Sequence, residues 1–246
     1  MLSKQKISLI NSLDKKKYRD QHQRYLLEGA KIVQTVLKAN PETIELVFLL
    51  PELLDAFREF ESICETVDER ELKKISRQKN PGGVVALARM PRIEEVPDHP
   101  SSGLYVFLDG VQDPGNVGTI IRSCDWFGVA QLFLGSGCAD LYNPKVIQSA
   151  MGSHLGVPVI SVDFFELLDY LQPDIILGAD MEGADPGRNY RGKTLLCMGS
   201  EGRGLSEEVR DACTAFTAVP GAGDKIAESL NVSTVSAILL DRLVNG

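Results

Sequence analysis

The sequence predicts an α/β protein in which a small α/β domain precedes a larger domain built on a parallel sheet. Beyond residue 103, short and almost continuously apolar runs alternate with helical patterns, which is typical of a parallel sheet covered on both faces. Between residues 89 and 103, three prolines, two serines and two adjacent glutamates interrupt this alternation. We therefore expect one domain over residues 1–90, an extended linker over 91–103 and a second domain over 104–246.

Within the first domain, each element has its own signal. Apolar residues at helical spacing predict a helix over 4–17, residues 25–27 are extended, and a second helical stretch covers 32–37 and stops before Pro41. Strands are then expected over 43–50, 63–67 and 83–88, and helices over 51–60 and 69–76. Together these elements form a small, self-contained α/β unit.

The second domain supplies six apolar runs with helical patterns between most of them. The expected strands cover residues 104–108, 131–134, 157–160, 174–177, 194–198 and 215–219. The expected helices cover residues 117–127, 144–151, 163–171, 206–212 and 232–244. Ligands of such sheets bind at the carboxyl ends of the strands, where polar loops follow at 109–118, 199–205 and 219–232. These three loops are the candidate ligand site.

The first of these loops leads into a helix. Asn116 stands about where an N-cap residue is expected, and Gly115 and Gly118 allow close backbone approach. Arg122 lies about a turn and a half inside the same helix. An arginine at this place is either an ordinary surface ion-pair residue or a clamp for a phosphate group.

The composition is that of an ordinary globular protein, and it excludes several classes. The chain has 246 residues, and no apolar run approaches the roughly 18 residues that span a bilayer, so we expect a cytoplasmic protein. Five cysteines and three histidines show no zinc spacing, so we expect reduced thiols and no metal. The loops also lack the nucleotide-binding fingerprints G-x-x-x-x-G-K-[ST] and G-x-G-x-x-G and the hydrolase motif G-x-S-x-G.

The charge distribution favours a polyanionic partner. The net charge is −8, but residues 1–40 hold nine Lys or Arg and only three Asp or Glu. A basic terminus on an acidic body is typical of a handle for RNA or DNA, although a solvated lysine-rich helix gives the same pattern.

Four segments of the second domain carry a family resemblance. They are 116–123 (NVGTIIRS), 143–152 (NPKVIQSAMG), 199–205 (GSEGRGL) and 228–233 (ESLNVS). In this order and spacing they resemble the motifs of the SpoU (TrmH-type) RNA methyltransferases of the SPOUT superfamily. Residues 1–90 are more faintly similar to the substrate-binding domain that often precedes this catalytic domain, through the segments 15–19, 27–29 and 83–86.

The resemblance implies transfer of a methyl group from S-adenosylmethionine to a ribose 2′-hydroxyl of rRNA or tRNA. It also implies a deep C-terminal trefoil knot, with the last strand and helix threaded through loops near residues 178–202, a rare exception to unknotted topology. A homodimer is expected as well, in which the apolar helix over 232–244 is a candidate interface.

The matching positions imply roles for single residues. Arg122 would contact an RNA phosphate or the developing alkoxide, and Glu201 would organise its loop. Asn116, Ser229 and Asn231 would orient that arginine and the ribose. The cofactor would be held mainly by backbone groups of Gly199, Val219 and Leu230, with Gly202 as a further cofactor residue. Gly178 and Asp180 would lie on a neighbouring loop that lines the adenosine pocket.

The chain departs from the family pattern at two positions. Gln148 stands where a basic residue is common, and Gly221 replaces a usual methionine. Two other functions stay open at this point. One is a catalytically silent RNA-binding protein of the same fold, and the other is a knotted methyltransferase that modifies an RNA base.

Overall fold

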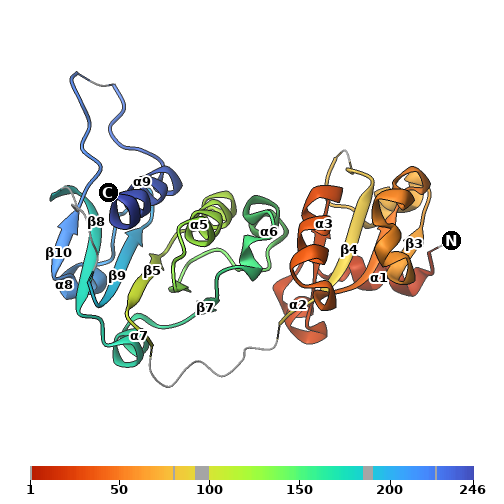
Figure 1. Cartoon of the computed structure of the whole chain (residues 1–246), viewed down its shortest axis with the longest axis horizontal. Helices are drawn as coiled ribbons and strands as arrows, with labels where there is room; N and C mark the ends of the chain where they lie inside the picture. The colour runs from red at the N-terminus through yellow and green to blue at the C-terminus, as the bar shows by residue number, and fades with distance from the viewer. Residues whose placement is uncertain (1, 80, 92–99, 185–190, 225) are drawn as a thin grey trace.

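The computed structural model of the chain describes residues 2–79, 81–91, 100–184, 191–224 and 226–246. It contains two sheets, one in each half of the chain, and Figure 1 shows the two halves side by side with helices around each sheet. The predicted α/β class with a parallel sheet is confirmed. No helix in the described ranges is both long enough and apolar enough to cross a membrane.

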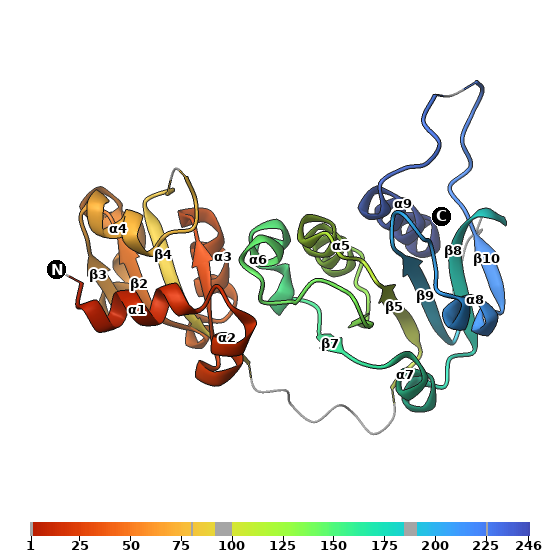
Figure 2. The same ribbon diagram turned by 180° about the vertical axis from the view of Figure 1, so that it is seen from behind.

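The N-terminal unit is built on a four-stranded sheet of order β1-β4-β2-β3. Its elements are α1 (Lys4–Ser12), α2 (Lys16–His22), β1 (Arg24–Glu28), α3 (Ala30–Ala39), η1 (Pro41–Thr43), β2 (Ile44–Leu49), η2 (Pro51–Ile63), β3 (Cys64–Thr66), α4 (Glu69–Ile75) and β4 (Val84–Arg89). Side chains alternate between the two faces of the sheet, so α3 packs on one face and α1 with α4 on the other (Figure 2).

Two predicted helices of this unit are wrong in extent or type. The segment 4–17 forms parts of two helices, because the guanidinium of Arg19 donates to the carbonyl oxygens of Leu13 (2.9 Å) and Asp14 (2.8 Å) in the turn between them. These bonds satisfy carbonyl groups that the end of α1 leaves free. The segment 51–60 lies in the 3₁₀ helix η2 instead of an α-helix.

The C-terminal unit is a six-stranded sheet of order β10-β8-β9-β5-β6-β7, and every pairing in it is parallel. Its elements are β5 (Gly103–Asp109), α5 (Pro114–Trp126), β6 (Gln131–Leu134), α6 (Pro144–Ala150), η3 (Ser153–Leu155), β7 (Val159–Ser161), α7 (Phe164–Leu171), β8 (Ile175–Ala184), β9 (Lys193–Gly199), α8 (Glu207–Ala212), β10 (Ala215–Thr217) and α9 (Val232–Asn245). One apolar core packs the sheet against α5, α6 and α9, and another packs it against α7 and α8. Helices therefore cover both faces, as the apolar runs predict.

The central strands β5 and β9 end at the same level of the sheet. They pair in register from Gly103 opposite Lys193 to Asp109 opposite Gly199. The loops after the two strands consequently start side by side. The backbone of the second loop folds back closely onto its strand, because a Cβ on Gly199 would lie 2.1 Å from the carbonyl carbon of Gly204.

Helix α6 joins the two units through a shared apolar core. Its residue Ile147 is buried in the core of the N-terminal unit. The ring of Tyr142, just before α6, lies 4.8 Å from the ring of Tyr25 on β1. The hydroxyl of Tyr25 also forms a buried hydrogen bond of 2.8 Å with Nε2 of His154 in η3. The two units are thus packed together, and are not only tethered by a linker.

Polar contacts add to this junction. Arg19 forms an ion pair of 2.5 Å with Asp140, and the amide of Gln78 donates to the side chain of Gln148 at 3.2 Å. Gln148, the position that departs from the family pattern, therefore contacts the N-terminal unit. The linker over 91–103 stays a prediction, because residues 92–99 lie outside the described part of the chain.

The buried His154 predicts that acid weakens the fold. Burial lowers the pKa of His154 to about 4, whereas an unfolded histidine titrates near 6.5. As the pH falls from about 6.5 towards 4, His154 is protonated in the unfolded state but stays neutral in the folded state. The free energy of unfolding therefore decreases across this window. Between pH 7 and pH 5, we expect the free energy of unfolding to fall by about 2 kcal/mol less in His154→Gln than in the wild type. Urea unfolding at the two pH values measures this difference.

The matched control for this experiment is His22→Gln, which should keep the pH dependence of the wild type. His22 lies on the half-exposed end of α2, outside the shared core. An equal pH dependence in His154→Gln and the wild type would contradict the role of His154.

Candidate active site

Two loops meet at the carboxyl edge of the C-terminal sheet. The first follows β5 over residues 110–113, and the second follows β9 over residues 200–206. Ser200 and Gly204 exchange two backbone hydrogen bonds (3.0 and 2.9 Å), which close the second loop into a tight turn, and the positive φ of Gly204 (68°) suits glycine. The carboxylate of Asp109 accepts from the backbone N–H of Ser206 at 2.6 Å. The two loops are therefore fastened to each other.

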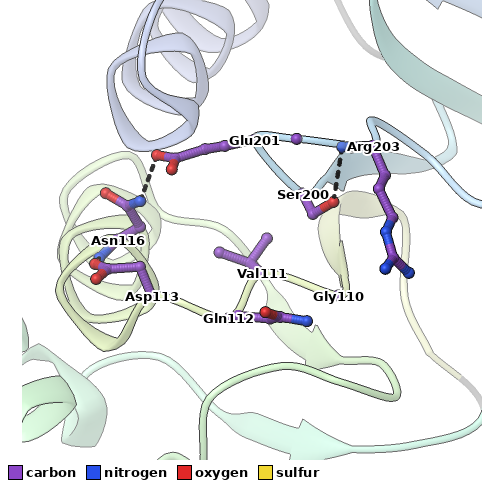
Figure 3. A pocket seen from close by; sticks show the side chains of 9 residues that line it. Gly110, Val111, Gln112, Asp113, Asn116, Ser200, Glu201 and Arg203 are labelled. Carbon is purple, nitrogen blue, oxygen red and sulfur yellow. Dashed lines mark hydrogen bonds between the residues drawn. The ribbon is translucent and has the colours of Figure 1, made fainter.

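A pocket of about 310 Å³ lies between these loops, and Figure 3 shows the side chains that face it. Its walls consist of Gly110, Val111, Gln112, Asp113, Asn116, Ser200, Glu201, Gly202 and Arg203. Three of these residues, Asn116, Glu201 and Gly202, are among those that the sequence singles out.

Three of the five predicted catalytic residues form one hydrogen-bonded cluster. Oε1 of Glu201 accepts from the side-chain amides of Asn116 (2.6 Å) and Asn231 (2.7 Å). The amide of Asn231 also donates to Oδ1 of Asn116 at 3.0 Å. The cluster thus brings together α5, the loop after β9 and the start of α9, which are far apart in the sequence. We call these three residues the amide–carboxylate cluster.

The predicted position of Asn116 relative to its helix is wrong. Asp113 is the N-cap of α5, because its carboxylate accepts from the backbone N–H of Asn116 (2.9 Å) and Pro114 occupies the first helical position. Asn116 lies in the first turn, which leaves its side chain free to reach Glu201. Asn231 precedes the first turn of α9 as its N-cap, with its side chain accepting from the backbone N–H of Ser233.

The other two predicted catalytic residues lie outside the cluster. Arg122 is exposed on α5, and its guanidinium makes no hydrogen bond or ion pair with any residue in the described ranges. Ser229 is also exposed, on the segment between β10 and α9. Figures 1 and 2 both show this segment extending away from the sheet before it returns to α9.

The predicted cofactor residues Gly178 and Asp180 lie within the strand β8, so the prediction that they lie on a loop is wrong. A Cβ on Gly178 would come within 2.8 Å of Sγ of Cys213 and 2.9 Å of the ring of Phe216, so neighbouring side chains fill this space. Asp180 forms an ion pair with Arg210, whose guanidinium lies 5.4 Å from the centre of the Phe216 ring.

The thiol of Cys213, the C-cap residue of α8, has an unusual environment. A hydrogen bond with Cys197 and the nearby charge of Arg210 lower the pKa of Cys213. The same hydrogen bond, together with burial, raises the pKa of Cys197. The spacing of the cysteines in the sequence gives no sign of this pair.

The remaining cofactor residues frame the segment between β10 and α9. Val219 packs against the main apolar core at its start, and Leu230 is exposed at its end, next to Asn231. In the described part of the segment, 219–224 and 226–230, no backbone group bonds to another described backbone group. These N–H and C=O groups are available to a ligand.

Sequence reasoning flagged the loops at this edge but gave no role to three of their residues, namely Asp109, Asp113 and Arg203. Their signal was positional: Asp109 ends a buried strand, Asp113 precedes a proline at a helix start, and Arg203 lies between two loop glycines.

Two family models match the chain. The SpoU rRNA methylase family matches residues 103–241, and an MRM3-like substrate-binding domain matches residues 4–86. Together with these matches, the fold and the site are those of an RNA methyltransferase. The chain belongs to the SpoU rRNA methylase family, as the four sequence motifs indicate.

Similar proteins extend this agreement over the whole chain. A structure from Porphyromonas gingivalis, assigned to the TrmH family of RNA methyltransferases, is 34% identical with a TM-score of 0.84, covering 100% of this chain and 99% of that one. An AdoMet-bound rRNA methyltransferase from Sinorhizobium meliloti is 25% identical with a TM-score of 0.82, covering 98% and 95%. The 23S rRNA (guanosine(2553)-2′-O)-methyltransferase RlmP of Bacillus subtilis is 29% identical, covering 97% of this chain and 96% of its own.

Proposed function

We propose that the protein transfers a methyl group from S-adenosylmethionine to a ribose 2′-hydroxyl of ribosomal RNA. The observation that carries this proposal is the amide–carboxylate cluster, which gathers three predicted catalytic residues beside a pocket at the carboxyl edge of the sheet. The similarity to RlmP, whose name specifies 2′-O-methylation of 23S rRNA, supports ribose over base and rRNA over tRNA.

The residues present fit the proposed cofactor. S-adenosylmethionine supplies a methyl group that its positively charged sulfur already activates. The unpaired backbone groups along residues 219–224 and 226–230 suit a ligand that is held by main-chain hydrogen bonds. We assign this binding to the backbone of Gly199, Val219 and Leu230, with Gly178, Asp180 and Gly202 around them.

The protein's own task is then to align and activate the hydroxyl. Glu201 holds the amides of Asn116 and Asn231 in fixed orientations. Asn231 also donates to Asn116 and so keeps it in place, and the second amide hydrogen of Asn116 can then position the ribose. Arg122 carries a positive charge with no partner among the described residues, which suits contact with a phosphate or a developing alkoxide. Ser229 would complete the site from the segment before α9.

The N-terminal unit is proposed to hold the RNA. Lys15, Lys16 and Lys17 are all exposed at the start of α2, where they can attract phosphates. The match to a substrate-binding domain supports this role. We also propose the domain limits 1–90 and 104–246, a cytoplasmic setting and the trefoil knot near residues 178–202, on the basis of the family.

A homodimer is proposed from two exposed apolar side chains. Trp126 is 83% exposed and Val244 is 39% exposed, at the carboxyl ends of α5 and α9, which pack in the same core. We expect light scattering to give twice the chain mass of 26.9 kDa, and Trp126→Asp to shift the protein towards monomer. Phe165→Asp, which changes an exposed residue on α7, is the control and should stay dimeric. A monomeric wild type would contradict the proposal.

Loss of Arg122 should remove most of the activity. We expect Arg122→Ala to lower kcat/KM by about 100-fold or more, because the substitution removes the positive charge proposed to contact the phosphate or the developing alkoxide. Transfer of labelled methyl groups to an in vitro transcript of 23S rRNA measures the rate, and alkali resistance of the modified linkage identifies a ribose product.

The control for this variant is Arg191→Ala, which removes an exposed arginine just before β9 at the opposite edge of the sheet. It should retain wild-type activity. Full activity in Arg122→Ala would refute the role of Arg122. Methylation of tRNA but not of rRNA would refute the proposal that rRNA is the substrate.

Glu201→Ala should disorganise the cluster without unfolding the protein. Both asparagine amides lose their shared acceptor, so we expect kcat to fall by roughly 10- to 100-fold. Thermal stability should change little, because Glu201 is exposed. Glu207→Ala, on the first turn of α8, is the matched control with wild-type kcat. A wild-type kcat in Glu201→Ala would show that the cluster does not serve the reaction.

A further inference from the structure

Arg203 is a positively charged residue in the wall of the pocket. The proposed mechanism assigns it no role. It is the single positively charged residue among the described residues that line the pocket. Figure 3 shows its side chain at the end of the pocket opposite Asn116 and Asp113. Its guanidinium forms no ion pair or hydrogen bond with the described residues, whereas Arg210 nearby in the sequence is paired with Asp180.

The backbone holds Arg203 in place. Its N–H donates to Oγ of Ser200 at 3.3 Å, inside the turn that Ser200 and Gly204 close. The bond from Ser206 to Asp109 fastens the end of the same loop to β5. Because the main chain is already fixed, binding a ligand through Arg203 requires no further ordering of the loop backbone.

The pocket wall holds two carboxyl groups, so a polyanion can bind there only if a cation offsets them. The carboxylates of Asp113 and Glu201 both line the pocket, and each accepts a hydrogen bond from an N–H group of Asn116. A nucleic-acid strand that enters between them needs a positive group to balance its phosphates. The guanidinium is the side chain whose paired N–H groups best match two phosphate oxygens.

We propose that this pocket receives the target nucleotide and that Arg203 binds the RNA phosphate next to the methylated ribose. The inference rests on the proposed function, and it adds a substrate contact that is separate from both Arg122 and the cofactor residues. Arg203 is a binding residue here, and it takes no part in proton or methyl transfer.

The test compares Arg203→Ala with Arg191→Ala in RNA binding and in methyl transfer. With an in vitro transcript of 23S rRNA, we expect KM and the dissociation constant for RNA to rise about tenfold in Arg203→Ala, with kcat almost unchanged. The slope of log affinity against log salt should fall by about 0.7, the value for one lost phosphate contact on a single strand. The affinity for S-adenosylmethionine by calorimetry should equal that of the wild type. Arg203→Lys should recover part of the RNA affinity.

The outcomes separate this inference from the proposed function. If the wild type methylates RNA but Arg203→Ala keeps wild-type RNA affinity and salt slope, the inference is overturned and the proposed function stands. A fall in kcat at unchanged RNA affinity, or a loss of cofactor affinity, also overturns it. If the wild type binds RNA but methylates none, the proposed function fails, and the inference fails with it.

Discussion

The active-site region depends on the parallel pairing of β5 and β9. Because Asp109 lies opposite Gly199, the two parallel strands end at the same level, and the loops that follow them lie side by side. The bond between Asp109 and the backbone of Ser206 then fastens the loops. Neither Glu201 nor Arg203 would have a fixed position without this register. A slip by one residue would also turn every core side chain of β9 to the opposite face of the sheet.

The second constraint is the packing of the N-terminal unit on α6. Ile147 and the bond between Tyr25 and His154 make the two units continuous inside a single apolar core. An RNA that binds the exposed lysines of α2 would therefore be held at a set distance from the pocket. In the proposed function, the junction would set the distance between the lysines that bind RNA and the pocket where RNA is modified.

Sequence reasoning predicted the architecture well, because apolar runs and helical spacing report burial directly. It predicted the parallel sheet, both layers of helices and the polar edge. It could not predict the turn that Arg19 makes after α1, because that turn depends on a side chain reaching back to carbonyl groups. It also missed the shared core, since Tyr25 and Ile147 look like residues of two separate cores in the sequence. In the site, the motifs indicated Asn116, Glu201 and Asn231, but only the three-dimensional structure shows that one carboxylate oxygen joins them.

That shared oxygen limits what the cluster can offer a substrate. Asn231 uses both hydrogens of its amide, one on Asn116 and one on Glu201, and its oxygen accepts from Ser233. Asn116 spends one of its two amide hydrogens on Glu201. Within the described ranges, one amide hydrogen of Asn116 and the second oxygen of Glu201 stay unused. One open donor beside one open acceptor is the complement of a hydroxyl group, which must both give and receive a hydrogen bond.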